Sequence, residues 1–322
     1  DAISDLLERP DVVAVQEVEN LDLLTALATE LGAYTAFLEE GNDERGIDVG
    51  FLVKDAVAAS NSRQLGKDAP GPAGVSCSDV DGRLFDRPPL AIDIAAGSVK
   101  LTVFSNHFSS RAAPDACREA QASFVRDQVE ALEAAGRQVV VAGDLNAFED
   151  EGALDILEDG ATTLTNQWSK APEQERYSFA FSGRLQTLDH ILVTDGLETR
   201  VEGFQYAHFD VDYFERDDRS DGHKVSDHDP PALTLSTSAC PGGDQRPTVV
   251  VGEIDSKVPN RDTGDGCTIG DLIDEEANSG RPGQLARHVA EVTQELATDG
   301  VISRREQGQI IQAAARAERR GR

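Results

Sequence analysis

Short runs of β-branched and other apolar residues recur along the first two thirds of the chain. Such runs, when bounded by turn-forming residues, are typical of buried strands. The pattern predicts strands at Val12 to Gln16, Asp48 to Val53, Val99 to Ser105, Gln138 to Gly143, Leu188 to Val193 and Ala232 to Ser236.

Apolar residues with helical spacing lie between some of these strands. Residues 22–31 form one such stretch, and Asp115 to Ala135 form a clearer one that ends at Gly136. Glycine often follows the last turn of a helix because it adopts a positive φ without strain. Strands mixed with helices in this way predict a layered α/β domain.

The last quarter of the chain has a different pattern. The segment STSACPGGDQRP is rich in Ser, Gly and Pro, and it predicts a linker over residues 237–247, between domains at 1–236 and 248–322. Beyond it, one helical face ends at Gly300, and Ser303 with Glu306 has the spacing of a capping box that opens another helix. The residues of the first face are Leu285, His288, Val289, Val292 and Leu296. We expect a small helical domain without catalytic residues.

Composition narrows the class of protein. The chain has 322 residues, 39% of them hydrophobic, and its 59 acidic against 30 basic residues give a net charge of −29. The length and the hydrophobic fraction are enough for a buried core. No apolar run approaches the ~18–20 residues of a membrane span. The charge disfavours any partner held by a broad basic surface, nucleic acid included, and favours a solvated acidic surface and divalent cations. The sequence identifies no protein partner.

The cysteines and the start of the chain bear on its destination. Cys77, Cys117, Cys240 and Cys267 lie far apart without CxxC spacing, which disfavours zinc and favours two disulfides in an exported protein. Of three connectivities we favour Cys77–Cys117 and Cys240–Cys267, because each pair then stays within one domain. The chain has no methionine and opens in a helical pattern without a visible signal peptide, so we expect a fragment or a processed form.

Polar side chains gather where the predicted strands end, which is where α/β folds place their sites. Taken singly, each has an ordinary structural explanation, such as a helix cap, an Asx turn or a hydrogen-bonded histidine. Their conjunction is what predicts a site. Four clusters lie at strand ends: Gln16-Glu17, Asn106-His107, Asp144 with Asn146, and Asp227-His228. A fifth, Asp189-His190, lies inside a strand.

Phosphodiester hydrolysis is the chemistry that uses this set of residues. Carboxylate oxygens such as those of Glu17 and Asp227 suit Mg²⁺ or Mn²⁺ better than zinc. Such an ion polarises the phosphoryl oxygen, while a carboxylate orients or deprotonates the attacking water. A histidine held by a carboxylate can stabilise the developing charge or protonate the leaving oxygen.

Six motifs in this order resemble the endonuclease/exonuclease/phosphatase superfamily, whose fold is that of DNase I. The motifs are DVVAVQEVEN, RGIDVGFLV, SNHFSS, VVVAGDLNAFED, LDHILV and SDHDP, and the resemblance covers about residues 1–236. The segments CREAQASFVRDQV, GDLNAFEDEGALDIL and YSFAFSGRLQTLDHIL are similar to the extracellular nuclease branch of bacteria. The tail, with DSKVPNRDTGDGCTIGDLIDEE, resembles an accessory domain of secreted, chiefly actinobacterial, proteins.

The resemblance implies a four-layer α/β sandwich, followed by the small helical domain. It implies a secreted, metal-dependent nuclease of low sequence selectivity that cuts by in-line attack of a metal-activated water and leaves 5′-phosphates. The substrate would be DNA, with RNA left open, and the cofactor Mg²⁺ or Mn²⁺.

The resemblance also implies a role for each site residue. Glu17 would be a metal ligand, and Asp227 a metal ligand or a close neighbour of one. Asp144 would orient or deprotonate the water, and Asn106 would bind phosphate. Asn146 would hold the scissile phosphate or a second ion. His228 with Asp189, and His107 with Asp48, would form two histidine–carboxylate pairs flanking the phosphate, and His190 is left as a structural residue. These assignments follow the motifs as they stand in the chain.

Two features depart from the family pattern. The family's first strand carries an asparagine that touches the metal and precedes residue 1, so we expect that strand to be missing. The acidic stretch from Asp210 to Asp221 also differs from the loop expected in the family. It predicts a solvated loop or, alternatively, a structural Ca²⁺ site.

Two other functions stay open. One is a phosphodiesterase acting on lipid head groups, like the bacterial sphingomyelinases, although aromatic residues make up only 5% of the chain. The other is a non-catalytic surface protein on the same scaffold, which the intact set of polar residues disfavours.

Overall fold

The computed structural model describes residues 1–160, 164–214, 220–240, 243–263, 266–274 and 284–320. The chain divides into two units by its contacts. The larger comprises Asp1–Ala96 and Lys100–Leu235, and the smaller comprises Gly97–Val99 and Ser236–Arg322.

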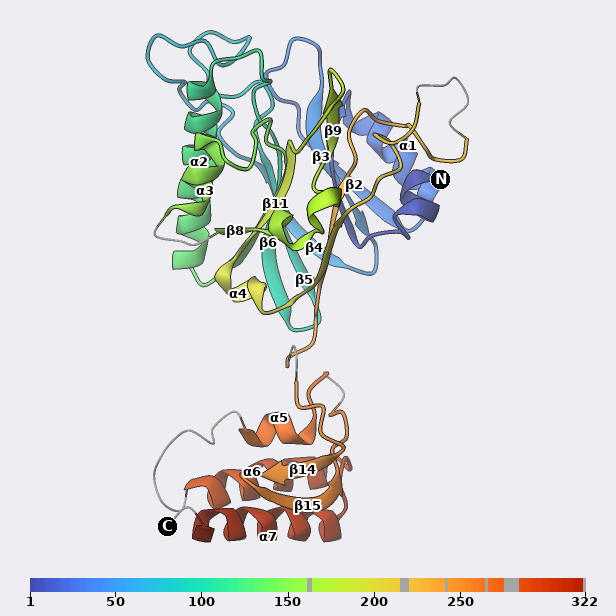
Figure 1. The fold of residues 1–322 in the computed structure, drawn as a ribbon, viewed down its shortest axis with the longest axis vertical. Helices are drawn as coiled ribbons and strands as arrows, with labels where there is room; N and C mark the ends of the chain where they lie inside the picture. The colour runs from blue at the N-terminus through green and yellow to red at the C-terminus, as the bar shows by residue number, and fades with distance from the viewer. Residues whose placement is uncertain (161–163, 215–219, 241–242, 264–265, 275–283, 321–322) are drawn as a thin grey trace. The chain divides into compact units, whose positions relative to one another are not determined.

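Two β-sheets form the centre of the larger unit (Figure 1). The first is antiparallel with the order β1-β3-β2, from β1 (Val12–Val18), β3 (Asp48–Lys54) and β2 (Tyr34–Leu38). The second has the order β4-β5-β6-β7-β11-β8, from β4 (Ala58–Gln64), β5 (Leu90–Ala96), β6 (Val99–His107), β7 (Gln138–Asp144), β11 (Asp189–Thr194) and β8 (Leu164–Asn166). Strands β6 and β7 are parallel and are joined through a helix, whereas β7 and β11 are antiparallel.

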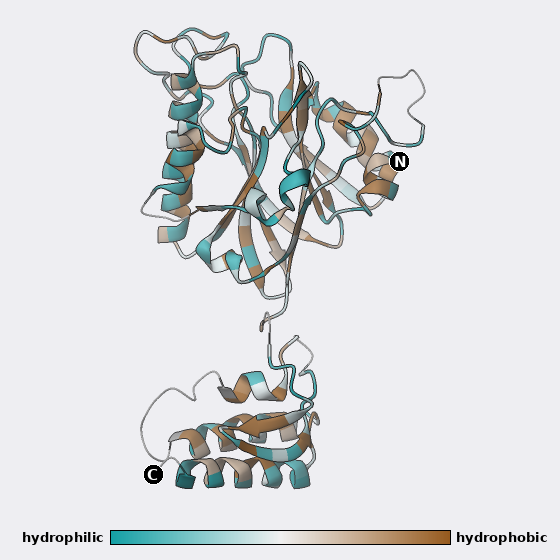
Figure 2. Ribbon diagram, in the orientation of Figure 1, coloured by the Kyte–Doolittle hydropathy of each residue, from teal (hydrophilic) through white to brown (hydrophobic). Residues whose placement is uncertain are grey.

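Helices cover the outer faces of both sheets. In Figure 1, α2 (Asp115–Ala134) and α3 (Gly152–Glu158) lie beside the six-stranded sheet, and α1 (Leu21–Leu31) lies beside the three-stranded one. Helix α2 buries Ala122, Val125 and Val129, which recur at helical spacing, in a core with residues of β6 and β7. In Figure 2 the hydrophobic colour follows these strands and the inward sides of the helices. The predicted four-layer α/β sandwich is confirmed.

The two sheets also contact each other directly. The Gln16 side-chain amide donates to the Ser105 hydroxyl at 3.2 Å, and that hydroxyl donates to the Val15 carbonyl at 3.3 Å. Strand β1 is thereby held against β6 close to the point where both strands end.

All six predicted strands are present, within two residues at each end, and so are both predicted helices of the larger unit. Several strands were not predicted. Strand β4, for example, reads AASNSRQ and has no apolar run, so its strand state depends on pairing with β5. The remaining elements are short: η1 (Ala2–Leu6), η2 (Gln167–Lys170), η3 (Glu173–Glu175), α4 (Asp195–Glu198), the hairpin β9 (Phe179–Phe181) with β10 (Arg184–Gln186), and the pair β12 (Val201–Tyr206) with β13 (Pro231–Leu235).

The smaller unit contains β14 (Thr248–Val251), β15 (Ile254–Pro259), α5 (Ile269–Asp274), α6 (Gln284–Thr298) and α7 (Arg304–Arg320). The expectation of a purely helical unit needs correction, because β14 and β15 form an antiparallel hairpin. Val249, Val251 and Val258 of this hairpin are buried against the helices. The predicted capping box is confirmed: the Glu306 carboxylate accepts from the Ser303 amide at 2.7 Å, and the Ser303 hydroxyl accepts from the Glu306 amide at 3.3 Å.

Both predicted disulfides are present. Cys77 is joined to Cys117 and Cys240 to Cys267, with Cα–Cα distances of 5.4 and 4.9 Å. The described part of the predicted linker contains no helix or strand, and its residues 241–242 lie outside the described residues. Among the helices that the structure describes, none is long and apolar enough to cross a membrane.

Candidate active site

The register of three neighbouring strands brings polar residues to one edge of the six-stranded sheet. His107, the last residue of β6, lies opposite Asp144, the last residue of β7. Asp144 in turn lies opposite Asp189, the first residue of β11. Directly paired residues project on the same face of a sheet, so the three side chains gather at one place.

Gly143 allows the strands to approach this closely. Its φ is +136°, and a Cβ added there would lie only 2.0 Å from the Asn106 carbonyl oxygen. No other residue type fits both the backbone conformation and the space. The glycine before Asp144 in the GDLNA motif therefore has a geometric reason.

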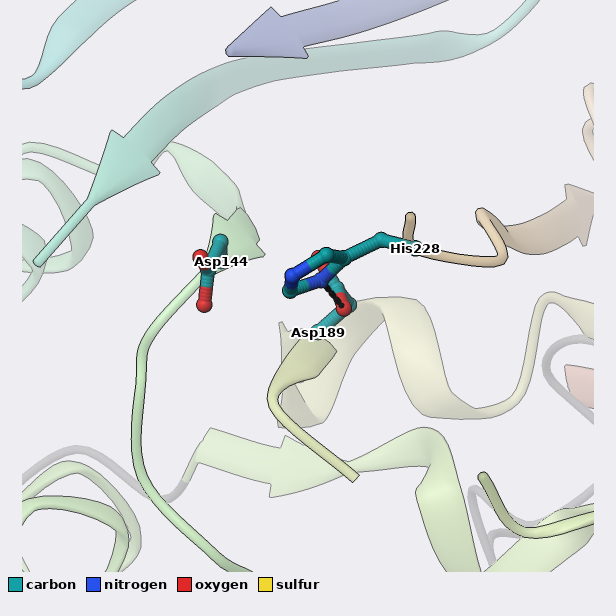
Figure 3. A group of neighbouring side chains, drawn as sticks. All are labelled: Asp144, Asp189 and His228. Atoms are coloured by element: carbon teal, nitrogen blue, oxygen red, sulfur yellow. Dashed lines mark hydrogen bonds and ion pairs between the residues drawn. The ribbon is translucent and has the colours of Figure 1, made fainter. Parts of the chain in front are cut away.

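His228 completes the cluster from the loop that precedes β13. Its Nδ1 lies 2.7 Å from Asp189 Oδ2, and both side chains are largely buried. Figure 3 shows the His228 ring between this partner and Asp144. Each of the three side chains offers an atom within 4.8 Å of the others, so the group could also hold a metal ion.

The surroundings keep His228 protonated at neutral pH. Burial lowers the pKa of His228, but the hydrogen bond and charge of Asp189, together with the charges of Asp144 and Asp227, outweigh burial and raise this pKa to about 9. An imidazolium held by a carboxylate suits the stabilisation of phosphate charge.

Asp144 is held by its neighbour in the GDLNA motif. Its Oδ1 accepts from the Asn146 amide at 2.8 Å, and its Oδ2 accepts from the Asn146 side chain at 3.0 Å. Burial, followed by the charge of Asp189, raises the pKa of Asp144 to about 7. A carboxyl group with such a pKa can gain or lose a proton near neutral pH.

Asn146 thus orients Asp144. Its φ is +49°, and its side chain also donates to the Phe108 carbonyl at 3.2 Å. Asparagine tolerates this conformation better than most residues. The direct phosphate or metal contact assigned to Asn146 stays a prediction.

The expected pairing of His107 with Asp48 is wrong. His107 is buried, its Nε2 lies 3.4 Å from Asp144 Oδ2, and its Nδ1 has no hydrogen-bond partner among the described residues. The Asp48 carboxylate instead accepts from the Gly41 amide at 2.8 Å. The motif alone does not determine where the Asp48 carboxylate points. Asp48 is the first residue of β3, and the loop before that strand brings the Gly41 amide to it.

His107 and Asp48 also have opposite pKa shifts. Burial, then the positive charges of Arg87, His228 and Arg45, holds the pKa of His107 well below its usual range. Burial raises the pKa of Asp48 to about 6 against the opposing Gly41 amide. His107 is therefore neutral at pH 7, which suits hydrogen bonding better than charge stabilisation.

Asn106 has one buried oxygen without a partner. Its side-chain amide group donates to the Ala142 carbonyl at 3.0 Å, and its Oδ1 accepts nothing from the described residues. Buried polar atoms are rarely left so, and an unpaired carbonyl oxygen suits a cation or a donor group of a ligand. The phosphate contact assigned to Asn106 stays a prediction.

The two expected metal ligands, Glu17 and Asp227, are exposed. Glu17 lies at an irregularity in β1 between Val15 and Val18, with a φ of +58°. Neither residue belongs to a group of three or more potential ligands within 4.8 Å of one another in the described parts of the chain. Their role as metal ligands stays a prediction, and the positive φ of Glu17 coincides with this irregularity of the strand pair.

Sequence reasoning overlooked Asp229, the last acidic residue of SDHDP. It is fully buried, accepts from the amides of Asp210 and Val211 at 2.9 and 3.0 Å, and lies 2.8 Å from His208 Nδ1. Its own amide donates to the Ser178 carbonyl at 2.7 Å. These bonds fix the backbone next to His228. A carboxylate directly before two prolines was the available signal.

The acidic stretch from Asp210 to Asp221 begins with a structural residue. The Asp210 carboxylate accepts from the amides of Val225 and Ser226 at 2.6 and 3.1 Å. Residues 215–219 of the stretch lie outside the described residues, and the Ca²⁺ site stays a prediction. A second acidic group, Asp43, Asp79 and Asp86, includes a carboxylate that is ion-paired with Arg87 at 2.7 Å.

His190 is engaged on both sides of its ring. Its Nε2 lies 3.0 Å from the Ala147 carbonyl, and its Nδ1 lies 3.0 Å from the side-chain nitrogen of Asn166. The ring therefore donates through Nε2 and accepts through Nδ1, which requires the neutral form. Burial lowers the pKa of His190 to about 4, against the opposing Ala147 carbonyl and Asp189.

This burial predicts a loss of stability in acid. The unfolded chain takes up a proton at His190 near pH 6.5, whereas the folded chain does so only near pH 4. The stabilisation that neutral, buried His190 gives to the folded state is therefore fully present above pH 6.5. It is lost as the pH falls toward 4, which lowers the free energy of unfolding by about 2–3 kcal/mol. Urea unfolding of the wild type and His190→Gln at pH 7 and 4.5 measures it. The variant should lose less stability between the two values, and an equal loss would contradict the assignment.

Comparison with known proteins fits this geometry. A model of the Endonuclease/Exonuclease/phosphatase family matches residues 1–228. Similar folds occur in an endonuclease/exonuclease/phosphatase from Bacteroides vulgatus (16% identity, 73% of this chain and 87% of that one, TM-score 0.53) and in truncated TDP2 from Caenorhabditis elegans (18% identity, 73% and 87%, TM-score 0.53). The human Nocturnin catalytic domain with bound sulfate anion is a third (14% identity, 71% and 83%, TM-score 0.52). No curated protein matches the chain.

Because the family model covers most of the chain, the protein belongs to the endonuclease/exonuclease/phosphatase family. It is accordingly a metal-dependent enzyme of the phosphodiesterase and nuclease kind.

Proposed function

We propose that this protein is a secreted nuclease of low sequence selectivity that hydrolyses phosphodiester bonds of DNA by in-line attack of water and leaves 5′-phosphates. RNA is the second substrate to be tested. The observation that carries the proposal is the buried Asp189–His228 pair, 2.7 Å apart, beside Asp144 at one edge of the sheet.

Each side chain has a task that follows from its surroundings. Asp144, oriented by Asn146 and with a raised pKa, accepts the proton of the attacking water. His228, kept protonated by Asp189, stabilises the added negative charge or donates to the leaving oxygen. The neutral His107 lies beside Asp144, with its Nε2 3.4 Å from Asp144 Oδ2.

Glu17 and Asp227 are the residues we propose to hold Mg²⁺ or Mn²⁺, and Asn106 is the residue we propose to bind the phosphate. When bound, such an ion would polarise the phosphoryl oxygens.

The net charge of −29 is the main physical objection to a nucleic-acid substrate. Some positive charge does lie close to the site: burial first, and then the charges of Arg87, His228 and Arg45, lower the pKa of His107. The acidic remainder of the surface offers few phosphate contacts, which predicts modest affinity.

Incubation with supercoiled plasmid tests the proposal directly. We expect nicked circles with Mg²⁺ or Mn²⁺ and none after EDTA is added, because the family depends on divalent metal. Linear products without nicked circles would indicate a different mode of cutting. An intact plasmid together with hydrolysis of sphingomyelin would overturn the nuclease proposal in favour of a lipid phosphodiesterase.

Secretion is supported by the two disulfides, since such bonds persist in oxidising compartments. Mass spectrometry of a non-reduced digest of exported protein should recover both linked peptides. Free thiols at all four positions in that material would remove this support.

A further inference from the structure

A hairpin beside the catalytic histidine carries an exposed aromatic ring. Strands β9 and β10 are joined by Ser182 and Gly183, whose φ values are +51° and +76°, as in the two-residue turns that fit hairpin twist. Residue Phe179 at the base of the hairpin also forms an isolated bridge with His228. The hairpin is therefore fixed to the active-site loop at one end and projects into solvent at the other.

Three rings follow one another from the active site to the hairpin tip. The Phe179 ring lies 4.6 Å from the His228 ring, and the Phe181 ring lies 6.4 Å from the Phe179 ring at an interplanar angle of 12°. Phe181 is 62% exposed. A large exposed ring so close to the reacting groups has a free face on which another planar group can stack.

The register of the hairpin places a cation next to this ring. Phe181 pairs with Arg184 across the two strands, so both side chains project on the same face as Phe179. Arg184 is exposed and forms no ion pair with the residues that the structure describes. Arg184 thus places a positive charge beside Phe181 at the turn of the hairpin, in a chain with 59 acidic and only 30 basic residues.

An aromatic face next to a guanidinium fits a nucleotide, whose base stacks while its phosphate pairs with the cation. A membrane fits less well. The other large exposed apolar side chain of the hairpin, Leu185, is 58% exposed but pairs with Ala180 on the opposite face, so the two large apolar side chains do not share one side that could insert.

We propose that the β9–β10 hairpin binds an unstacked nucleobase flanking the scissile phosphate, with Phe181 stacked on the base and Arg184 on its phosphate. This inference rests on the proposed nuclease function and specifies its substrate. Bases are free to stack on protein only where the nucleic acid is single-stranded, frayed or distorted. The enzyme therefore prefers such regions to intact duplex.

Binding without turnover tests the hairpin separately from catalysis. The probe is a single-stranded oligonucleotide with 2-aminopurine, titrated in EDTA and followed by fluorescence quenching, with an abasic oligonucleotide of the same length for comparison. Phe181→Ala should weaken binding of the base-bearing probe by roughly 5- to 150-fold, while Phe181→Trp restores it. The wild type should bind the base-bearing probe more tightly than the abasic strand, by the same factor that Phe181→Ala loses. Phe181→Ala should bind the two strands equally.

Leu185→Ala is the matched control, because it removes a similarly exposed apolar side chain from the other face of the same hairpin. It should bind the probe like the wild type. In Mg²⁺, kcat/KM for single-stranded oligonucleotide should fall in Phe181→Ala by the same factor as binding. Arg184→Gln should reduce the slope of log binding constant against log salt concentration by about 1, which corresponds to the loss of one phosphate contact.

Three results would overturn the proposal. If the wild type cleaves plasmid but Phe181→Ala binds and cleaves the oligonucleotide normally, the hairpin proposal fails and the nuclease proposal survives. If Leu185→Ala and Phe181→Ala weaken binding equally, the effect is not stacking on one face. If both instead reduce co-sedimentation with phosphatidylcholine–sphingomyelin vesicles, the hairpin serves a membrane.

Discussion

Replacing His228 with alanine is expected to lower kcat for phosphodiester cleavage by about 10²–10⁴-fold, the usual contribution of a general acid or base. The imidazolium is the positive group that this chain holds against Asp189 and next to Asp144. Because its pKa is raised to about 9, the wild type should lose activity as the pH rises through about 9. The variant should lack that alkaline decline.

The fold must be separated from the chemistry in this test. His228→Ala leaves the largely buried Asp189 without its cation, so we expect a lower melting temperature as well as lower activity. The double variant His228→Ala/Asp189→Asn removes the unpaired charge, and it should recover the melting temperature without recovering kcat. A single variant within a few-fold of wild-type kcat would exclude His228 from the mechanism.

Asp144→Asn is expected to reduce kcat by a similar factor while leaving the fold as stable or more stable in EDTA. Asparagine keeps nearly the same shape but cannot accept the proton of the attacking water. Burial and the charge of Asp189 raise the pKa of Asp144 to about 7, so above pH 7 the folded protein holds a carboxylate at a cost that the unfolded chain avoids. Removing this charge should raise the melting temperature most at pH 8, and least at pH 5, where Asp144 is protonated in the folded protein.

Asn146→Ala is the matched comparison for this variant. It leaves the carboxylate in place but removes the side-chain donor that lies 3.0 Å from it, so kcat should fall less than in Asp144→Asn. Thermal unfolding and cleavage kinetics of both variants test this order. A fully active Asp144→Asn would contradict the role of Asp144 as the base.

The layers of the larger unit were predictable because each depends on a local pattern. Strand β7 reads QVVVAGD, and its middle residues from Val139 to Gly143 lack polar side chains because the strand is buried on both faces. Helix α2 repeats its apolar residues at helical spacing over 20 residues. Strands β4 and β10 have no such pattern, since their pairing partners determine their conformation.

The site was predictable as a set of residues, but only in part as a set of contacts. Asp189 and His228 pair as the resemblance to the family implied, although His228 comes from the loop before β13, which belongs to another sheet than β11. His107 turned to Asp144 and not to Asp48, since strand register places it there and the Gly41 amide holds Asp48. Asp229 was overlooked because its three partners come from residues 208, 210 and 211, which no local pattern connects to it.

The central claim is that this cluster directs water to a phosphodiester bond. Cleavage of a short DNA oligonucleotide in oxygen-18-labelled water with Mg²⁺ or Mn²⁺, followed by mass spectrometry of the products, tests it most directly. The account predicts fragments whose new 5′-phosphates carry one labelled oxygen and whose new 3′-hydroxyls carry none. Unlabelled 5′-phosphates, 3′-phosphate ends or release of inorganic phosphate alone would contradict it.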